Sequence, residues 1–291
     1  MSTEWQTSKS IKRRLYTQSC MIDLLLISFF PLLLVLGYTL PLGIRESLVF
    51  SYSDPTVLAA FGSSFIHFGL GHLLTNVVLY ALVVPVLYVL SATSNRQQQF
   101  RVFTFTAILA FPPVLSYLNL AIPRSAETYG ASGVIMVFVG YLPLALAEYL
   151  DSNFDIGPIR TVSPVIFFAS LVLISVLSLQ SVLLRDLTVL IGTTGLVLAT
   201  VLTTAWYVIS AYEEMDDPQA KFRTAIRGTG YTDLPLLTVL LLFIVLMIAF
   251  PANPRAGNDV LNLYEHFIGY ALAFIIAYIN NLALQVSVRP E

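Results

Sequence analysis

The sequence predicts an all-α polytopic membrane protein with about eight transmembrane helices, because its composition and its long apolar stretches both require a bilayer. Hydrophobic residues make up 57% of the 291 residues, charged residues make up 11%, and the mean hydropathy is +0.80. A soluble domain carries roughly 25% charged residues, so this chain could not cover itself with a water-exposed surface. A helix needs about 20 mostly apolar residues to cross the bilayer. The stretches that qualify are about 20–43, 72–92, 102–121, 132–150, 163–180, 186–212, 233–250 and 264–286.

The first apolar stretch is predicted to be a retained transmembrane helix, with a cleaved signal peptide as the alternative. The run over 20–43 exceeds the roughly 7–15-residue apolar core of a signal peptide, and no small-residue cleavage site follows it. We therefore expect residues 1–19 to form a polar cytoplasmic tail, and residues 20–286 to form one transmembrane domain.

The distribution of basic residues predicts that both termini are cytoplasmic and that the chain lies in a cell membrane. With eight spans and the N-terminus inside, eleven Lys and Arg residues fall in cytoplasmic segments and four in outer segments. This asymmetry agrees with the positive-inside rule, and a seven-span topology would remove it. The cytoplasmic set is Lys9, Lys12, Arg13, Arg14, Arg96, Arg101, Arg160, Lys221, Arg223, Arg227 and Arg289, and the outer set is Arg45, Arg124, Arg185 and Arg255.

Net charge and cysteine content exclude several classes of function. The formal net charge of −2 provides no basic field for nucleic acid, so no nucleic-acid partner is expected. Cys20 is the only cysteine, which excludes an internal disulfide and a cysteine-based metal site. No cofactor or metal is expected, and the oligomeric state stays open.

Two features near the predicted membrane surfaces are interpreted as interfacial rather than functional. Asp23 and Glu148 fall near cytoplasmic ends of spans, and we expect both at the membrane interface rather than in a functional site. The outer loop over 44–71 mixes polar and aromatic residues, so we expect it to lie in the headgroup region.

The first of three polar clusters leads into the second predicted span and reads His67-Phe-Gly-Leu-Gly-His72-Leu-Leu-Thr-Asn76. Ionisable groups within membrane spans are costly and usually functional. Residues four apart share one face of a helix, so we expect His72 and Asn76 to project side by side near the membrane surface. The alternative for this pair is a hydrogen bond that serves only helix packing.

The second cluster, Tyr129-Gly130-Ala131-Ser132-Gly133, opens the fourth predicted span. A serine between glycines at a loop-to-helix junction can be approached closely by another backbone. The free N–H groups at a helix start can also hold an anion. The alternative for Ser132 is a small residue that only permits packing.

The third cluster, Glu265-His266-Phe-Ile-Gly269, opens the last predicted span. Gly269, Ala273 and Ala277 follow one another at four-residue spacing, a small-residue stripe that allows close helix packing in a bilayer. This stripe could bring His266 against the fourth helix. Glu265 is expected to point elsewhere, because adjacent helical positions face about 100° apart.

The eight-span topology predicts that these three clusters meet, because spans two, four and eight all begin on the outer side. A serine, an imidazole and an amide could then share one site. We interpret Ser132 as a nucleophile and His266 as its general base. His72 and Asn76 would donate hydrogen bonds to an oxyanion.

In combination, the clusters resemble the rhomboid family of intramembrane serine proteases. That family has a His-x4-His-x3-Asn run in its second helix, Gly-x-Ser-Gly opening its fourth, and a histidine followed three residues later by glycine opening its last. The resemblance covers roughly residues 50–150 and 260–285. The matching positions are His67, His72, Asn76, Gly130, Ser132, Gly133, His266 and Gly269.

The resemblance implies a rhomboid-like helical bundle, a six-helix core plus two extra helices. The catalytic segments would be 60–150 and 260–286, with the extra helices within 160–250. The family has one span between its serine helix and its histidine helix, whereas three are predicted here. The aromatic residue that often follows the serine by four positions is Met136 here, and residues 56–61 lack the Trp-Arg pair of many bacterial members.

By the same resemblance, the chain would cleave transmembrane protein substrates near the outer membrane face. Ser132 would attack the scissile carbonyl and His266 would accept its proton, with no acidic third member. The Ser132 N–H and the side chains of Asn76 and His72 would stabilise the oxyanion. The residues expected to give structural support are His67, Gly130, Gly133 and Gly269.

Two other functions compete with proteolysis. A catalytically silent relative would bind client transmembrane helices without cutting them, but such relatives usually lack the serine or the histidine. A small-molecule transporter usually places its site near the bilayer midplane, within repeated halves. Here the polar clusters gather near one surface, and no internal repeat is visible.

Overall fold

The computed structural model describes residues 21–180, 187–227, 232–256 and 259–287, and confirms that the chain is all-α and polytopic. The predicted tail 1–19, Cys20, Arg185 and Arg289 lie outside the described residues. The helices are α2 (Met21–Thr39), α3 (Leu42–Ser47), α4 (Val57–Gly62), the 3₁₀ turn η1 (Ser63–Phe65), α5 (Leu70–Thr93), α6 (Gln97–Leu109), α7 (Phe111–Asn119), α8 (Ser132–Phe154), α9 (Ile159–Gln180), α10 (Leu187–Glu213), α11 (Pro218–Arg227), α12 (Asp233–Ala249) and α13 (Leu263–Ser287). The strands are β1 (Phe50–Ser51), β2 (Glu127–Thr128), β3 (Arg255–Ala256) and β4 (Asp259–Val260).

The number of membrane-spanning helices is six by length and composition among the described residues, or seven if α6 and α7 count as one bent span. The α6–α7 pair bends by 47°, and Pro112 with Pro113 lies in the first turn of α7, where proline fits a helix start. The seventh predicted stretch, 233–250, corresponds to α12, which has 17 residues. At 1.5 Å per residue α12 extends about 25 Å, somewhat less than a hydrocarbon core of about 30 Å.

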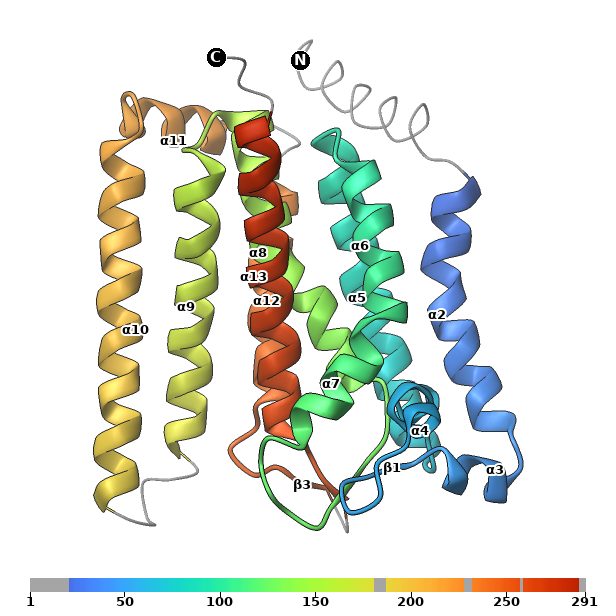
Figure 1. Ribbon diagram of the computed structural model, residues 1–291. Coiled ribbons are helices and arrows are strands. Elements are labelled where there is room, and N and C mark those ends of the chain that lie inside the picture. Colours follow the sequence, from blue (N-terminus) through green and yellow to red (C-terminus); the bar gives the residue numbers. More distant parts are fainter. Residues whose placement is uncertain (1–20, 181–186, 228–231, 257–258, 288–291) are drawn as a thin grey trace.

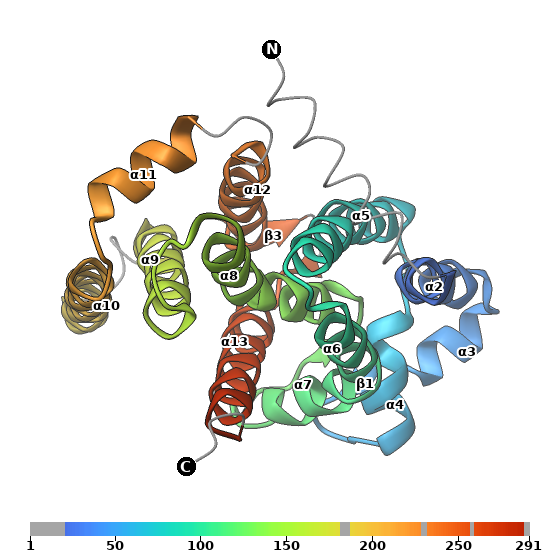
Figure 2. The same ribbon diagram turned by 90° about the horizontal axis from the view of Figure 1, so that it is seen from above.

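Helix α8 forms the centre of the bundle, with α5, α9, α12 and α13 packed around it (Figure 2). In its most apolar window 94% of the residues are buried inside the protein, against 11% for α10. Helix α8 is therefore a core helix, whereas α10 packs mainly on α9 and leaves most of its apolar surface to lipid.

The three helices between α8 and α13 differ in how they join the bundle. Helices α9 and α10 form a pair at one side (Figure 1), but α9 also packs against α8, α12 and α13. Helix α12 packs against α5, α8 and α9. Helices α9 and α12 therefore both belong to the packed bundle, and α10, which packs mainly on α9, is peripheral.

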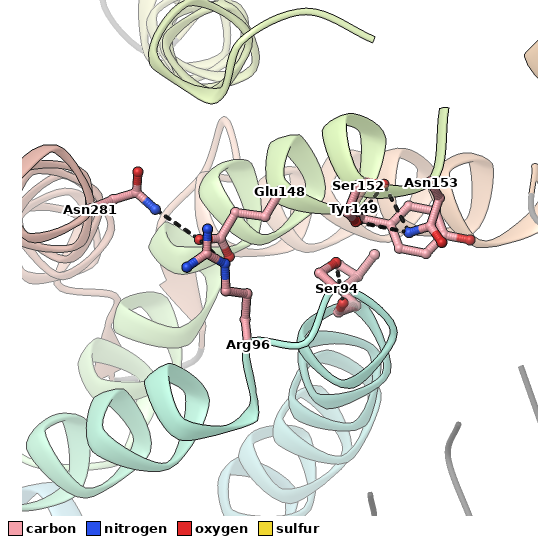
Figure 3. A network of polar contacts seen from close by, with 8 residues as sticks. Ser94, Arg96, Glu148, Tyr149, Ser152, Asn153 and Asn281 are labelled. Atoms are coloured by element: carbon pink, nitrogen blue, oxygen red, sulfur yellow. Dashed lines mark hydrogen bonds and ion pairs between the residues drawn. The ribbon is translucent and has the colours of Figure 1, made fainter. Parts of the chain in front are cut away.

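Two ion pairs, each with a buried carboxylate and a partly exposed arginine, connect the helices at the end opposite to the start of α8. Asp23 is fully buried and receives hydrogen bonds from Arg101, with Nε at 2.5 Å and Nη2 at 3.0 Å. Glu148 is 1% exposed, accepts a hydrogen bond from Asn281 Nδ2 at 2.8 Å, and lies 3.6 Å from Arg96 Nε (Figure 3). The sequence did not predict this burial, because the arginines and the amide come from other parts of the chain.

The segment between α2 and α5 folds onto the other end of the bundle. Strand β1 pairs antiparallel with β2, in a register that places Phe50 opposite Thr128. Phe50 is fully buried, and the backbone N–H of Gly130 donates to the Ser63 carbonyl at 2.8 Å. These contacts fix the turn that enters α8.

Candidate functional site

Helices α5, α8 and α13 all begin at one end of the bundle, the lower end in Figure 1, and α12 ends there. We call it the site end. It therefore receives the three polar clusters that the sequence singles out, together with the chain that leaves α12.

Ser132 is the first residue of α8 and is half-buried. Gly130 lies two residues before Ser132 and has a φ of +103°, a backbone conformation that residues other than glycine rarely adopt. A Cβ atom at Gly130 would also lie 2.7 Å from Cε1 of His72. Glycine at this position therefore lets the His72 ring pack directly against the turn that leads into Ser132.

His266 lies in the first turn of α13 and is 3% exposed. Its Nδ1 lies 2.9 Å from the carbonyl oxygen of Ala249, the last residue of α12. A carbonyl oxygen can only accept, so Nδ1 carries the proton and donates. In the neutral ring Nε2 is then unprotonated, and it is buried without a hydrogen-bond partner. The Phe250 ring lies nearly perpendicular to this imidazole, with centroids 6.2 Å apart.

The first turn of α8 is in close contact with the first two turns of α13, because Gly133 and Gly269 lie at the contact. A Cβ atom at Gly269 would lie 2.6 Å from the Gly133 carbonyl oxygen, and one at Gly133 would lie 2.5 Å from Oε1 of Glu265. One helix turn separates His266 from Gly269. The backbone approach expected from the small-residue stripe is present at its first position.

The structure places Ser132 and His266 at the starts of neighbouring helices, but no hydrogen bond joins them. His266 Nε2 has no partner, so the Ser132 hydroxyl does not reach it in this conformation. Catalytic hydrogen bonds are often long or poorly aligned before substrate binds, and they tighten in the reacting complex.

Asn76 contacts His67 rather than pairing with His72. The Nδ2 atom of Asn76 lies 2.8 Å from Nε2 of His67, and both side chains are buried. The His72 ring is half-buried and packs edge-on against His67, with centroids 4.9 Å apart. The expected side-by-side pair is thus a group of three, with His67 in contact with both other members.

Burial keeps His67 neutral. The pKa of His67 is lowered from 6.5 to about 4, chiefly by burial and in addition by the charge of His72, while a backbone hydrogen bond with Phe65 opposes both. A neutral imidazole can accept at Nε2, which leaves the Asn76 amide as the donor. This bond uses one of the two amide N–H groups of Asn76.

This pKa predicts a loss of stability on acidification. Between pH 6.5 and about 4 the unfolded chain binds a proton at His67 that the folded chain does not, so the free energy of unfolding falls as the pH falls through that window. The full contribution is roughly 3 kcal/mol. We expect thermal unfolding in detergent to occur at lower temperature at pH 5 than at pH 7, and His67→Gln to reduce that difference. An identical difference in the variant would contradict this assignment.

Sequence reasoning missed two contributors from the end of α12. The carbonyl of Ala249 is a backbone group, so no residue type reveals it. Phe250 is an aromatic residue that ends an apolar stretch, directly before Pro251, and only the packing of α12 shows that its ring contacts the His266 ring. It supplies the aromatic contact that Met136, on α8, does not.

Within the part of the chain that the structure describes, no three His, Cys, Asp or Glu side chains are grouped as metal ligands would be. The chain matches no protein-family model, no curated protein and no solved structure.

Proposed function

We propose that the chain is an intramembrane serine protease of the rhomboid type, which cleaves transmembrane protein substrates with a Ser132–His266 dyad. The observation that carries the proposal is the state of His266. Its Nδ1–H is committed to the Ala249 carbonyl at 2.9 Å, and its buried Nε2 has no partner, at a helix start that contacts the start of the serine helix. A general base next to a serine needs this tautomer and this open lone pair.

In the proposed reaction the Ser132 hydroxyl attacks the scissile carbonyl while His266 Nε2 accepts its proton. His266 then gives that proton to the leaving amine. In the second half of the reaction, water attacks the acyl-serine carbonyl while His266 Nε2 accepts its proton. His266 passes this proton to the Ser132 oxygen as the carboxylic acid product leaves. The dyad has no acidic third member. The carbonyl at the C-terminus of α12 holds the imidazole instead, and the negative end of the helix dipole favours the imidazolium.

The developing oxyanion would be stabilised at the start of α8. The backbone N–H of Ser132 is one of the first four of that helix, which have no intrahelical partner. The second amide N–H of Asn76 and the His72 ring, which lies against Gly130, would complete the oxyanion hole. His67, Gly130, Gly133 and Gly269 would act through packing.

We propose a rhomboid-type core in which α12 is the segment between the serine helix and the histidine helix, with α9 and α10 as the two extra helices. The support is that the end of α12 supplies the Ala249 carbonyl and the Phe250 ring to His266. We propose that the site end faces the outer side of a cell membrane and that both termini are cytoplasmic. The charge asymmetry of the loops supports this orientation.

The test of this function is cleavage in a reconstituted bilayer. Purified protein in lipid vesicles should cut a co-reconstituted single-span substrate that carries small residues near its outer end, and EDTA should not slow the reaction. The observation that favours the catalytically silent alternative is that no hydrogen bond joins Ser132 and His266. Client binding without any cleavage product would support that alternative.

We expect Asn76→Ala to leave measurable cleavage. Loss of one oxyanion donor typically lowers kcat by about 10²–10³-fold, and the Ser132 N–H with His72 would remain. Rates measured at saturating substrate report this effect. A rate equal to that of the wild type would remove Asn76 from the oxyanion hole.

A further inference from the structure

Glu265 is a buried carboxylate immediately before His266. It is 7% exposed, although it lies at the end of the bundle. Its Oε2 atom accepts hydrogen bonds from Thr128 Oγ1 at 2.9 Å, Asn262 Nδ2 at 2.9 Å and Asn119 Nδ2 at 3.2 Å. The three donors belong to β2, to the residue before α13, and to the end of α7, so the carboxylate joins three segments.

A second layer of contacts surrounds these donors. The exposed Arg124 donates from Nη2 to Asn119 Oδ1 at 3.3 Å and to Asn262 Oδ1 at 3.2 Å. It also donates to the Tyr52 hydroxyl at 3.2 Å, and its guanidinium lies 5.1 Å from the centre of the Tyr52 ring. Arg124 therefore brings a positive charge to the network from the loop that leads to Ser132.

The carboxylate also fixes where α13 begins. Asn262 precedes the helix, and its Oδ1 accepts from the backbone N–H of Glu265 at 3.3 Å, which is the contact of an N-cap residue. The Asn262 carbonyl accepts from the backbone N–H of His266 at 3.1 Å. With the side-chain bond from Asn262 to Glu265, these contacts form a reciprocal cap that resembles a capping box.

On its other side the carboxylate touches α8. A Cβ atom at Gly133 would lie 2.5 Å from Oε1 and 2.9 Å from Cγ of Glu265. The side chain thus lies between the polar network and the first turn of the serine helix. Burying a carboxylate is costly unless it is paired and fully hydrogen-bonded, which is why so many donors converge on it.

We propose that Glu265 is a positioning residue, which holds the first turn of α13, and with it His266, in register with the first turn of α8. This inference rests on the proposed function for its catalytic consequence. The geometry it maintains is the bond from His266 Nδ1 to the Ala249 carbonyl, which leaves Nε2 without a partner at the contact between the two helix starts. Misplacing catalytic groups by about 1 Å can cost about 10²-fold in rate.

Two substitutions separate the acceptor from the mere volume of the side chain. Glu265→Gln keeps a carbonyl oxygen for the donors that meet at Oε2, whereas Glu265→Leu keeps similar bulk without an acceptor. We expect Glu265→Leu to lower kcat about 10²-fold at nearly unchanged KM, and Glu265→Gln to stay within about tenfold of the wild type. The matched control is Glu127→Leu, an exposed carboxylate on β2, which should keep the wild-type kcat.

A spectroscopic readout tests the inference even if the protein cleaves nothing. In protein labelled with ¹⁵N-histidine, with signals assigned by His266→Ala, the wild type and Glu265→Gln should show His266 protonated at Nδ1 and unprotonated at Nε2. Glu265→Leu should lose that pattern. If Glu265→Leu does not fold, Thr128→Val removes one donor and should lower kcat by a few fold.

The outcomes that overturn the inference differ from those that overturn the function. A wild type without cleavage defeats the proposed function alone, because the His266 signals still report the positioning. Folded Glu265→Leu with the wild-type His266 signals and kcat defeats the positioning role alone. A Gln variant as impaired as the Leu variant would also contradict it, because the acceptor would then not matter.

Discussion

Ser132→Ala and His266→Ala are each expected to abolish cleavage of a reconstituted transmembrane substrate. Removing the hydroxyl removes the nucleophile. Removing the imidazole removes a general base that typically contributes about 10²–10⁴-fold. The two groups act as one unit, so the double variant should be no slower than either single variant.

A matched control lies on the same helix. Ser152→Ala changes a serine in the last turn of α8, at the end of the bundle opposite to the site, and should cleave at the wild-type rate (Figure 3). Thermal unfolding of all four variants should confirm that they fold. Cleavage by Ser132→Ala at the wild-type rate would end the protease interpretation.

Gly140→Ala is expected to have the largest effect on stability. A Cβ atom at Gly140 would fall on the backbone carbonyl oxygen of Tyr270 and 3.0 Å from Cβ of Ala273. A backbone group cannot swing aside as a long side chain can, so α8 and α13 must separate. Overpacking of a buried site costs about 1–3 kcal/mol, which corresponds to roughly 10 °C in Tm at the upper limit. Activity per folded molecule should fall as well, because the same two helices carry Ser132 and His266.

The control for Gly140 is another glycine within a helix. Gly192 lies in α10, and a Cβ atom there would meet nothing within 4 Å. Gly192→Ala should leave Tm and cleavage unchanged or raise Tm slightly, since alanine favours the helix more than glycine does. Equal effects of the two substitutions on Tm would contradict the close packing of α8 against α13.

Hydropathy predicted the helices well because each span must satisfy its own backbone within an apolar sequence. The stretches around Leu70–Thr93 and Ser132–Phe154 illustrate this, since both became single long helices. The break between α6 and α7 and the short α12 were less evident. Contacts with neighbouring helices decide whether such a segment bends or crosses the whole bilayer. These contacts leave no regular pattern of apolar residues in a single sequence.

The candidate site was predicted in part. The spacing of His67, His72 and Asn76 on one stretch, and the glycines around Ser132, marked the segments that the fold brings to one end. The network around Glu265 was missed, because two of its donors, Asn119 and Thr128, lie more than 130 residues before Glu265 in the chain. The expectation that Glu265 points away from His266 considered only direct contact between the two side chains. It did not consider that Glu265 could act on His266 through the capped start of α13.

The central claim is that His266 activates Ser132, and covalent labelling tests it most directly. Folded protein in lipid vesicles would be treated with a fluorophosphonate, digested, and analysed by mass spectrometry. We predict a single adduct on Ser132 in the wild type, formed at least about 10²-fold more slowly in His266→Ala. An unlabelled Ser132 in the folded wild type, or labelling at the same rate without His266, would contradict the account.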